Sequence, residues 1–189
     1  MRSNPFSSRF VRPGALPFLA PRSRLEALVE MVAAGGRWAI VGPHGTGKTT
    51  LVHHLRSRLE LDRSRPSRLV SLHDGGQRRR REGTQGVLFI DGYEQLSRLG
   101  RWRWAAMRDL VVTAHAPPRG FSVLTQTAVD DALAMAIVAR LVARAPAPVA
   151  PRDAVKALRN AEGNMRDALI ALYRVHEAHA APGPYATVQ

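Results

Sequence analysis

Short apolar stretches alternate along the chain with longer segments in which apolar residues recur at helical spacing. Buried strands are expected at residues 38–41, 87–90 and 110–113, with two weaker strands at 68–72 and 121–124. Helices are expected from residue 23 to the glycines at 35–36, and over 48–61, 95–107, 127–143, 152–161 and 164–179. Because strands that alternate with helices form parallel sheets, the pattern predicts an α/β fold with a mostly parallel central sheet flanked by helices.

Changes in composition divide the chain into four segments. Four prolines and several turn signals make residues 1–22 an extended lead-in. Residues 23–145 carry the strands and most of the helices, and are expected to form the core domain. The Ala-Pro-Ala-Pro sequence at 145–148 breaks the chain, and a small helical, lid-like segment (146–180) and a tail (181–189) follow it.

Two capping-box patterns, each a hydroxyl residue three positions before an acidic one, predict where helices begin. Ser23 with Glu26 would start the helix before the first strand, and Thr127 with Asp130 the helix after the last strand. In each case the hydroxyl is expected to accept a hydrogen bond from a backbone N–H of the first helical turn.

Residues 42–49 match the phosphate-loop pattern G-x-x-x-x-G-K-[ST] in full, between an expected strand and an expected helix. The matching residues are Gly42, Pro43, His44, Gly45, Thr46, Gly47, Lys48 and Thr49, with Thr50 directly after them. Glycines let backbone N–H groups converge on phosphate oxygens at the N-terminus of the next helix. Lys48 is expected to reach the β- and γ-phosphates, Thr49 to ligate Mg²⁺, and Thr50 to lie beside the α-phosphate.

A carboxylate follows the buried strand at 87–90. Asp91 at the end of such a strand is costly unless a cation meets it, and Mg²⁺ beside the phosphates would supply that charge. Asp91 is therefore interpreted as the Walker B aspartate, the alternative being a cap for the next helix.

Hydrolysis of a bound nucleotide would also require a residue that orients the attacking water, and the sequence marks this residue less clearly. Many ATPases of this type carry a glutamate directly after the aspartate, but this chain has Gly92 there. Glu94 is the nearest candidate, so Glu94 and Lys48 are the expected catalytic residues. The alternative for Glu94 is a favourable interaction with a helix dipole.

With both motifs in place, the chain resembles the AAA+/STAND branch of the ASCE P-loop NTPases over about residues 23–179. Asp91 and Glu94 occupy the two acidic positions of the Asp-Gly-x-Asp/Glu form found in STAND ATPases. The resemblance implies that Thr113 is the polar sensor-1 residue and that Arg166, within 163–169, is a sensor-2 arginine near the γ-phosphate. A strand-end hydroxyl and a solvent-facing arginine are the alternatives. The overall layout is similar to that of small bacterial ATPases.

This resemblance implies an ATP-binding, Mg²⁺-dependent ATPase that couples nucleotide binding and hydrolysis to a conformational change, alone or in a homo- or hetero-oligomer. Two departures from the family pattern stand out. No helix is evident between the second and third strands, and the helical appendage is shorter than a full AAA+ lid. Gly92 leaves open a weakly hydrolysing nucleotide switch or DNA-binding adaptor. A small-molecule kinase is a further alternative, disfavoured because 41 residues precede the loop.

The net positive charge of the chain points to a possible nucleic-acid partner. The chain has 28 Lys and Arg residues against 15 Asp and Glu, a net charge of +13, and only two of its cations are lysines. Clustered cations neutralise nucleic-acid phosphates, whereas a general preference for arginine over lysine would need no partner. The candidate nucleic-acid contacts are Arg78, Arg79, Arg80 and Arg81, with Arg101 and Trp104 in an alternating Arg-Trp sequence. Such alternation suits base stacking. The helical spacing predicts that Trp102 packs in the core and that Trp104 is the freer of the two to contact a partner.

Several classes are excluded. The chain has no cysteine, which rules out disulfides, Cys-ligated zinc, iron–sulfur clusters and thiol nucleophiles. Its longest apolar run, residues 132–139, is far shorter than the roughly 20 residues that cross a bilayer. A cytoplasmic protein without a membrane span is expected.

Overall fold

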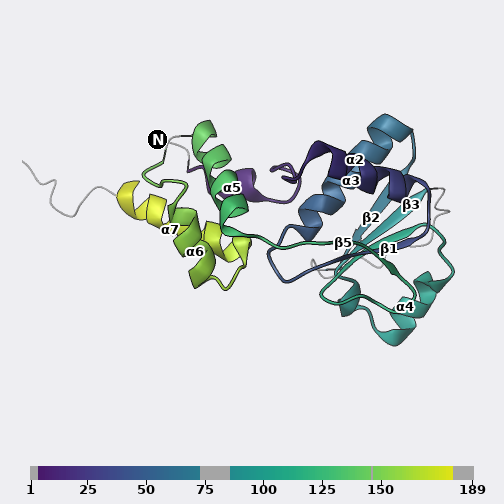
Figure 1. Cartoon of the computed structure of the whole chain (residues 1–189). Coiled ribbons are helices and arrows are strands. Elements are labelled where there is room, and N and C mark those ends of the chain that lie inside the picture. The colour runs from purple at the N-terminus through teal and green to yellow at the C-terminus, as the bar shows by residue number, and fades with distance from the viewer. Residues whose placement is uncertain (1–3, 73–85, 146, 181–189) are drawn as a thin grey trace, which may run out of the picture. The chain divides into compact units, whose positions relative to one another are not determined.

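The computed structural model describes residues 4–72, 86–145 and 147–180. The chain forms two compact units: Pro17–Ala128, here called the sheet unit, and Met1–Leu16 with Val129–Gln189, here called the helical unit. Figure 1 shows the strands in the first and helices α5, α6 and α7 in the second.

The sheet unit is built on five strands that pair in parallel in the order β2-β3-β4-β1-β5. They are β1 (Arg37–Val41), β2 (Ser67–Ser71), β3 (Val87–Asp91), β4 (Leu110–Ala114) and β5 (Ser122–Gln126). The register sets Val41 opposite Ala114 and Ser71 opposite Asp91, so the carboxyl ends of these strands share one edge. The expected α/β fold with a parallel sheet is confirmed, with all five strands within two residues of their predicted limits.

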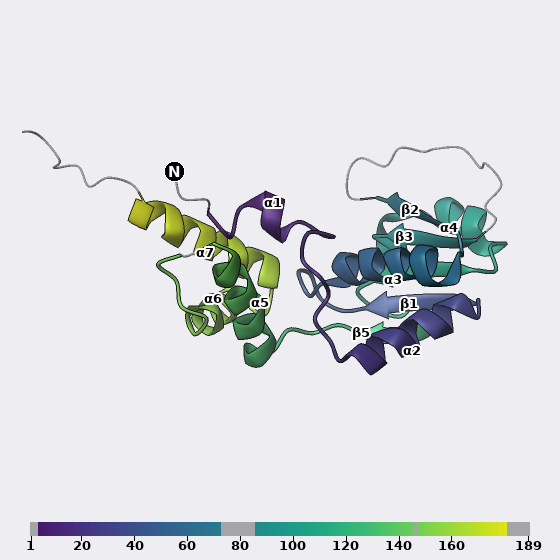
Figure 2. The same ribbon diagram turned by 90° about the horizontal axis from the view of Figure 1, so that it is seen from above.

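Helices cover both faces of this sheet. Helices α2 (Arg22–Ala33) and α3 (Lys48–Arg63) pack on one face, against side chains such as Ile40 and Phe89. The short 3₁₀ helix η1 (Tyr93–Gln95) and helix α4 (Arg98–Ala105) lie on the other, as Figures 1 and 2 show for α4. Burial on both faces explains why the central strands are apolar without alternation.

Both capping-box predictions are wrong. Helix α2 begins at Arg22, one residue before Ser23, and Glu26 pairs with Arg22 at 2.7 Å in an i,i+4 ion pair instead of closing a box. In the helical unit, the side chain of Asp130 itself caps helix α5 by accepting a hydrogen bond from Leu133 N at 2.7 Å. The hydroxyl of Thr127 is bonded elsewhere, as described below.

The predicted helix at 95–107 is interrupted. Leu96 is extended between η1 and α4, and α4 starts only after Ser97, whose hydroxyl accepts from Gly100 N. The helical spacing counted from Leu96 therefore does not continue into α4. As a result, the prediction that Trp102 is the buried tryptophan of the two is wrong. Trp102 is 76% exposed, while Trp104 packs against the core.

The helical unit has its own core. It contains α1 (Ser8–Val11), α5 (Asp131–Arg144), α6 (Asp153–Asn160) and α7 (Met165–Ala180). Buried side chains from all three long helices meet at Val138, Leu158 and Leu169, and Phe6 from the N-terminal segment joins them. No helix in the described ranges is long and apolar enough to cross a membrane.

The division of the chain differs from the expected boundaries at 22 and 145. Helix α5, expected in the core domain, packs with α6 and α7, because its buried face (Ala134, Val138, Leu141) is shared with them. The N-terminal lead-in is not simply extended, since it forms α1 and buries Phe6. Asn4 fixes this segment by donating to Glu177 Oε1 at 2.6 Å.

Helix α3 offers a matched test of the sheet unit's core. Leu55 is fully buried and Leu61 is 75% exposed on the same helix. Leu55→Ala should lower the free energy of unfolding by about 2–5 kcal/mol, and Leu61→Ala should change it by less than about 0.5 kcal/mol. Urea unfolding followed by tryptophan fluorescence measures this, because Trp38, Trp102 and Trp104, the chain's three tryptophans, all lie in this unit. Equal costs for the two variants would contradict the packing described here.

Candidate functional site

The 42–49 loop joins β1 to α3 at the carboxyl edge of the sheet. Gly45 and Gly47 have φ angles of +70° and +91°, a conformation that favours glycine. Gly42 is required for a different reason: a Cβ there would lie 2.3 Å from Thr127 Oγ1 and 2.5 Å from Thr127 O. The loop therefore depends on glycine both for its turns and for its close approach to the segment after β5.

Two buried threonines anchor this loop. Thr46 Oγ1 donates to Pro43 O at 2.9 Å and lies 2.7 Å from Thr127 Oγ1. Thr127 N in turn donates to Val41 O at 2.8 Å. The role of Thr127 was missed from the sequence, although its position just after a strand at the same edge was available as a signal.

The lysine of the loop is folded onto it. Lys48 Nζ donates to Gly42 O and to Pro43 O, at 2.6 Å in each case. Lys48 is also the first residue of α3, so the ammonium group and the positive end of the helix lie together. This combination attracts anions.

Asp91, at the end of β3, is held by hydroxyl groups from two neighbouring elements. Thr49 Oγ1 of α3 donates to Asp91 Oδ2 at 2.8 Å, and Thr113 Oγ1 of β4 donates to Asp91 Oδ1 at 2.6 Å. Gly92 N donates to the same Thr113 hydroxyl at 2.8 Å. Asp91 is only 2% exposed, so its carboxylate interacts with protein groups beside the 42–49 loop and hardly with solvent.

The pair formed by Thr49 and Asp91 fits a magnesium ion. Mg²⁺ prefers oxygen ligands and usually takes only one or two from protein, with phosphate and water completing its shell. Across the described ranges, no group of three or more His, Asp or Glu side chains is placed to hold a metal ion. Two oxygen ligands beside an anion-attracting loop suit a cation that arrives with phosphate.

Glu94 lies on η1, beyond the end of β3. Its Oε1 is 3.6 Å from Nδ1 of His115, a residue just past β4 that the sequence analysis did not single out. Arg101 supports the same turn, with Nη2 donating to Glu94 O at 3.2 Å and Nε donating to Leu96 O at 3.0 Å. Arg101, expected as a nucleic-acid contact, thus has its guanidinium engaged beside the site.

The predicted site residues fall into three groups. The loop residues, Asp91, Thr113 and Glu94 meet at the carboxyl edge of the sheet, with Thr50 half-buried in the first turn of α3. Arg166 is exposed on α7 of the helical unit, where its backbone N–H donates to Asn164 Oδ1. The arginines at 78–81 lie outside the described residues.

Comparison with known proteins identifies structures of similar fold but no close relative in sequence. No family model matches the chain, and no curated protein matches it significantly in sequence. Among solved structures, Orc1 from Aeropyrum pernix in complex with DNA matches with a TM-score of 0.60 at 16% identity, over 92% of this chain and 64% of that one. NtrX from Brucella abortus matches with a TM-score of 0.57 at 16% identity, over 92% of this chain and 54% of that one.

The chain has a P-loop-like α/β fold that is similar to the folds of these two proteins. NtrX in complex with ATP also matches, with a TM-score of 0.55 at 16% identity, over 93% of this chain and 55% of that one. The chain thus spans less than two thirds of the length of these structures. In this fold, β4 lies between β1 and β3. This order explains how Thr113 of β4 comes to lie beside the carboxylate of β3, one strand away from the β1 loop.

Thr113 tests how Asp91 is held. Thr113→Val removes the hydroxyl and keeps the shape, leaving Asp91 Oδ1 and Gly92 N without this partner. The free energy of unfolding of the sheet unit should fall by about 1–3 kcal/mol, the cost of unsatisfied buried polar groups. Thr113→Ser keeps the hydroxyl and should recover most of that loss in the same urea titration. If valine were tolerated as well as serine, the hydrogen-bonded network would not be holding the carboxylate.

Proposed function

We propose that this protein binds ATP with Mg²⁺ and hydrolyses it, as an ATPase of the AAA+/STAND type. The observation that carries the proposal is the network of Thr49, Asp91 and Thr113 at the edge that also holds the 42–49 loop and Lys48. A buried carboxylate is stable next to a bound cation, and an anion-attracting loop beside it suits the phosphates of a nucleotide.

Each residue has a part in this proposal. Backbone N–H groups of the 42–49 loop would bind phosphate oxygens, and Lys48 would neutralise the β- and γ-phosphates. Thr49 and Asp91 would hold Mg²⁺, which when bound neutralises charge on those phosphates. Thr50, in the first turn of α3, would lie beside the α-phosphate.

Glu94 is the proposed general base. Water forms a bond to the γ-phosphorus while the bond from that phosphorus to the bridging oxygen breaks, giving ADP and phosphate. The proton that the water gives up passes to the Glu94 carboxylate. Glu94 Oε2 has no hydrogen-bond partner among the described residues, so no donor among them would compete with the water for this oxygen.

Lysine substitutions test nucleotide binding. Free ATP at 100 times its Kd should raise the free energy of unfolding by about 2.7 kcal/mol if it binds only the folded protein. Lys48→Ala should lose most of this gain, because it removes the cation of the loop. Lys156→Ala is the matched control, since Lys156 is the chain's other lysine and is exposed on α6. Binding that survives in Lys48→Ala, or fails in the unmodified protein, contradicts the proposal.

A comparison of the wild-type protein with Glu94→Gln separates an enzyme from a nucleotide switch, the alternative that Gly92 after Asp91 favours. Phosphate release is measured with ATP and Mg²⁺ across a range of protein concentrations. An ATPase should lose turnover in Glu94→Gln and keep ATP binding. Wild-type turnover no higher than that of Glu94→Gln, with binding intact, would instead assign the chain as a switch or adaptor. A specific rate that rises with concentration would indicate assembly into an oligomer.

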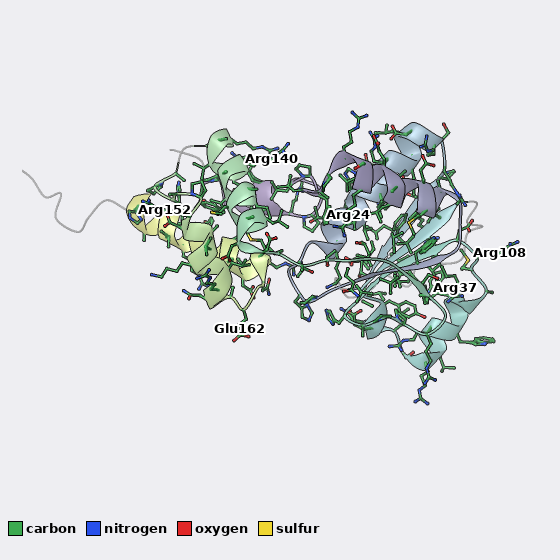
Figure 3. The ribbon with its side chains drawn as sticks, in the orientation of Figure 1. Arg24, Arg37, Arg108, Arg140, Arg152 and Glu162 are labelled. Atoms are coloured by element: carbon green, nitrogen blue, oxygen red, sulfur yellow. The ribbon has the colours of Figure 1, made fainter. Side chains whose placement is uncertain are left out.

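A nucleic-acid interaction is the second candidate function, favoured by the surface of α4. Trp102 is exposed on this helix, which carries arginines and no acidic residue. An exposed tryptophan among cations suits the stacking of unpaired bases. Charge elsewhere is spread over both units, as the exposed residues Arg108, Arg140 and Arg152 in Figure 3 illustrate. The tryptophan therefore distinguishes α4 from the rest of the basic surface.

Trp102→Ala tests this second function. Its affinity for oligo-dT, measured by fluorescence anisotropy at one fixed salt concentration, should fall by a factor of about 5 or more, given the usual 1–3 kcal/mol for each stacked base. Trp102→Phe should retain part of the affinity because it retains an aromatic ring. Leu61→Ala, an equally exposed apolar site on α3, serves as the control. Unchanged binding in Trp102→Ala would remove α4 as the contact and leave the arginines at 78–81.

A further inference from the structure

A pair of histidines lies between the 42–49 loop and Glu94. His44, in the loop, contacts the ring of His115 with the centroids 4.0 Å apart and the planes at 62°. His115 Nδ1 is in turn 3.6 Å from Glu94 Oε1. These contacts connect the loop to the carboxylate through two imidazole rings that the proposed function has not used.

Glu94 requires support of this kind because of where it lies. It comes three residues after Asp91, on η1, and not directly after the aspartate on the line of the strand. Arg101 fixes the backbone of the turn through Glu94 O. It leaves the side chain to be directed by its own contacts, and a glutamate side chain loses considerable conformational freedom when it is held in one orientation.

The two oxygens of the Glu94 carboxylate differ in their surroundings. Oε1 is the oxygen nearest His115, and Oε2 is buried with no hydrogen-bond partner within the described part of the chain. A contact that engages Oε1 therefore directs Oε2, the oxygen left to accept a proton.

We propose that His115 is a positioning residue that directs the Glu94 carboxylate for ATP hydrolysis, and that His44 confines the His115 ring from the phosphate-binding side. This inference rests on the proposed ATPase function. His115 acts through Glu94 and does not touch the nucleotide. Because His44 belongs to the loop that would bind the phosphates, the orientation of Glu94 depends on the conformation of that loop.

The first experiment compares nucleotide affinity with the rate of the chemical step in the full chain. ATP binding is measured by calorimetry with Mg²⁺, and hydrolysis by single-turnover release of phosphate. His115→Ala should slow single-turnover hydrolysis at least 10-fold and leave the Kd for ATP within about 2-fold, since uniform binding is not affected. His115→Gln, which keeps a side-chain N–H donor, should recover much of the rate. His179→Ala removes an exposed histidine of the helical unit and should match the wild type.

The second experiment asks whether His115 acts through Glu94. Residues that act as one unit have non-additive effects on rate. In a Glu94→Gln background, adding His115→Ala should therefore lower the residual rate by less than 2-fold. If the two losses multiply, His115 acts independently of Glu94 and the proposal is overturned.

The outcomes also separate this inference from the proposed function. A wild-type protein that binds no ATP, or binds it without turnover, overturns the ATPase proposal and with it the role of His115. A wild type that hydrolyses ATP, with His115→Ala at an unchanged rate, overturns the positioning role alone. Loss of ATP binding in His115→Ala would assign the residue to the nucleotide pocket or to the stability of β4, and would also overturn it.

Discussion

A buried carboxylate imposes the main constraint on the sheet unit. Asp91 ends a strand that is buried throughout, and its charge cannot be solvated from there. Its neighbours are accordingly hydroxyl groups, one from the strand beside it and one from the first turn of α3. These two bonds connect β3, β4 and α3 at one point, so the group that is most costly to bury also fixes the geometry of the edge where the loop lies.

The sequence predicted those features that arise from continuous local patterns. The strands 38–41, 87–90 and 110–113 are apolar because helices cover both faces of the sheet, and this property is visible without a structure. The 42–49 loop was equally visible, since the positive φ angles of Gly45 and Gly47 require glycine within the loop itself. In both cases the signal lies within a few residues of the sequence.

Features that depend on which segments meet were not predictable in this way. The contact of His115 with Glu94 and His44 requires the strand order β3-β4-β1, which no local pattern reveals. The exposed side of α4 was misassigned because the extended Leu96 shifts the helical register by an amount that the spacing does not encode. Helix α5 was assigned to the core domain by its place in the sequence, yet its apolar face is shared with α6 and α7.

The difference between local patterns and contacts of distant segments also bears on the position after Asp91, where this chain has Gly92. A glutamate directly after Asp91 would be directed by the strand that carries it. Gly92 has a φ of +87° and turns the chain into η1, so the chain has already left the sheet when it reaches Glu94. In the proposed site the orientation of Glu94 would come from other elements: Arg101 donates to its backbone oxygen and His115 lies beside its carboxylate. In the proposed ATPase, Glu94 would therefore act only together with these neighbours, which makes the residues after β4 and in α4 part of the same proposed site as the loop.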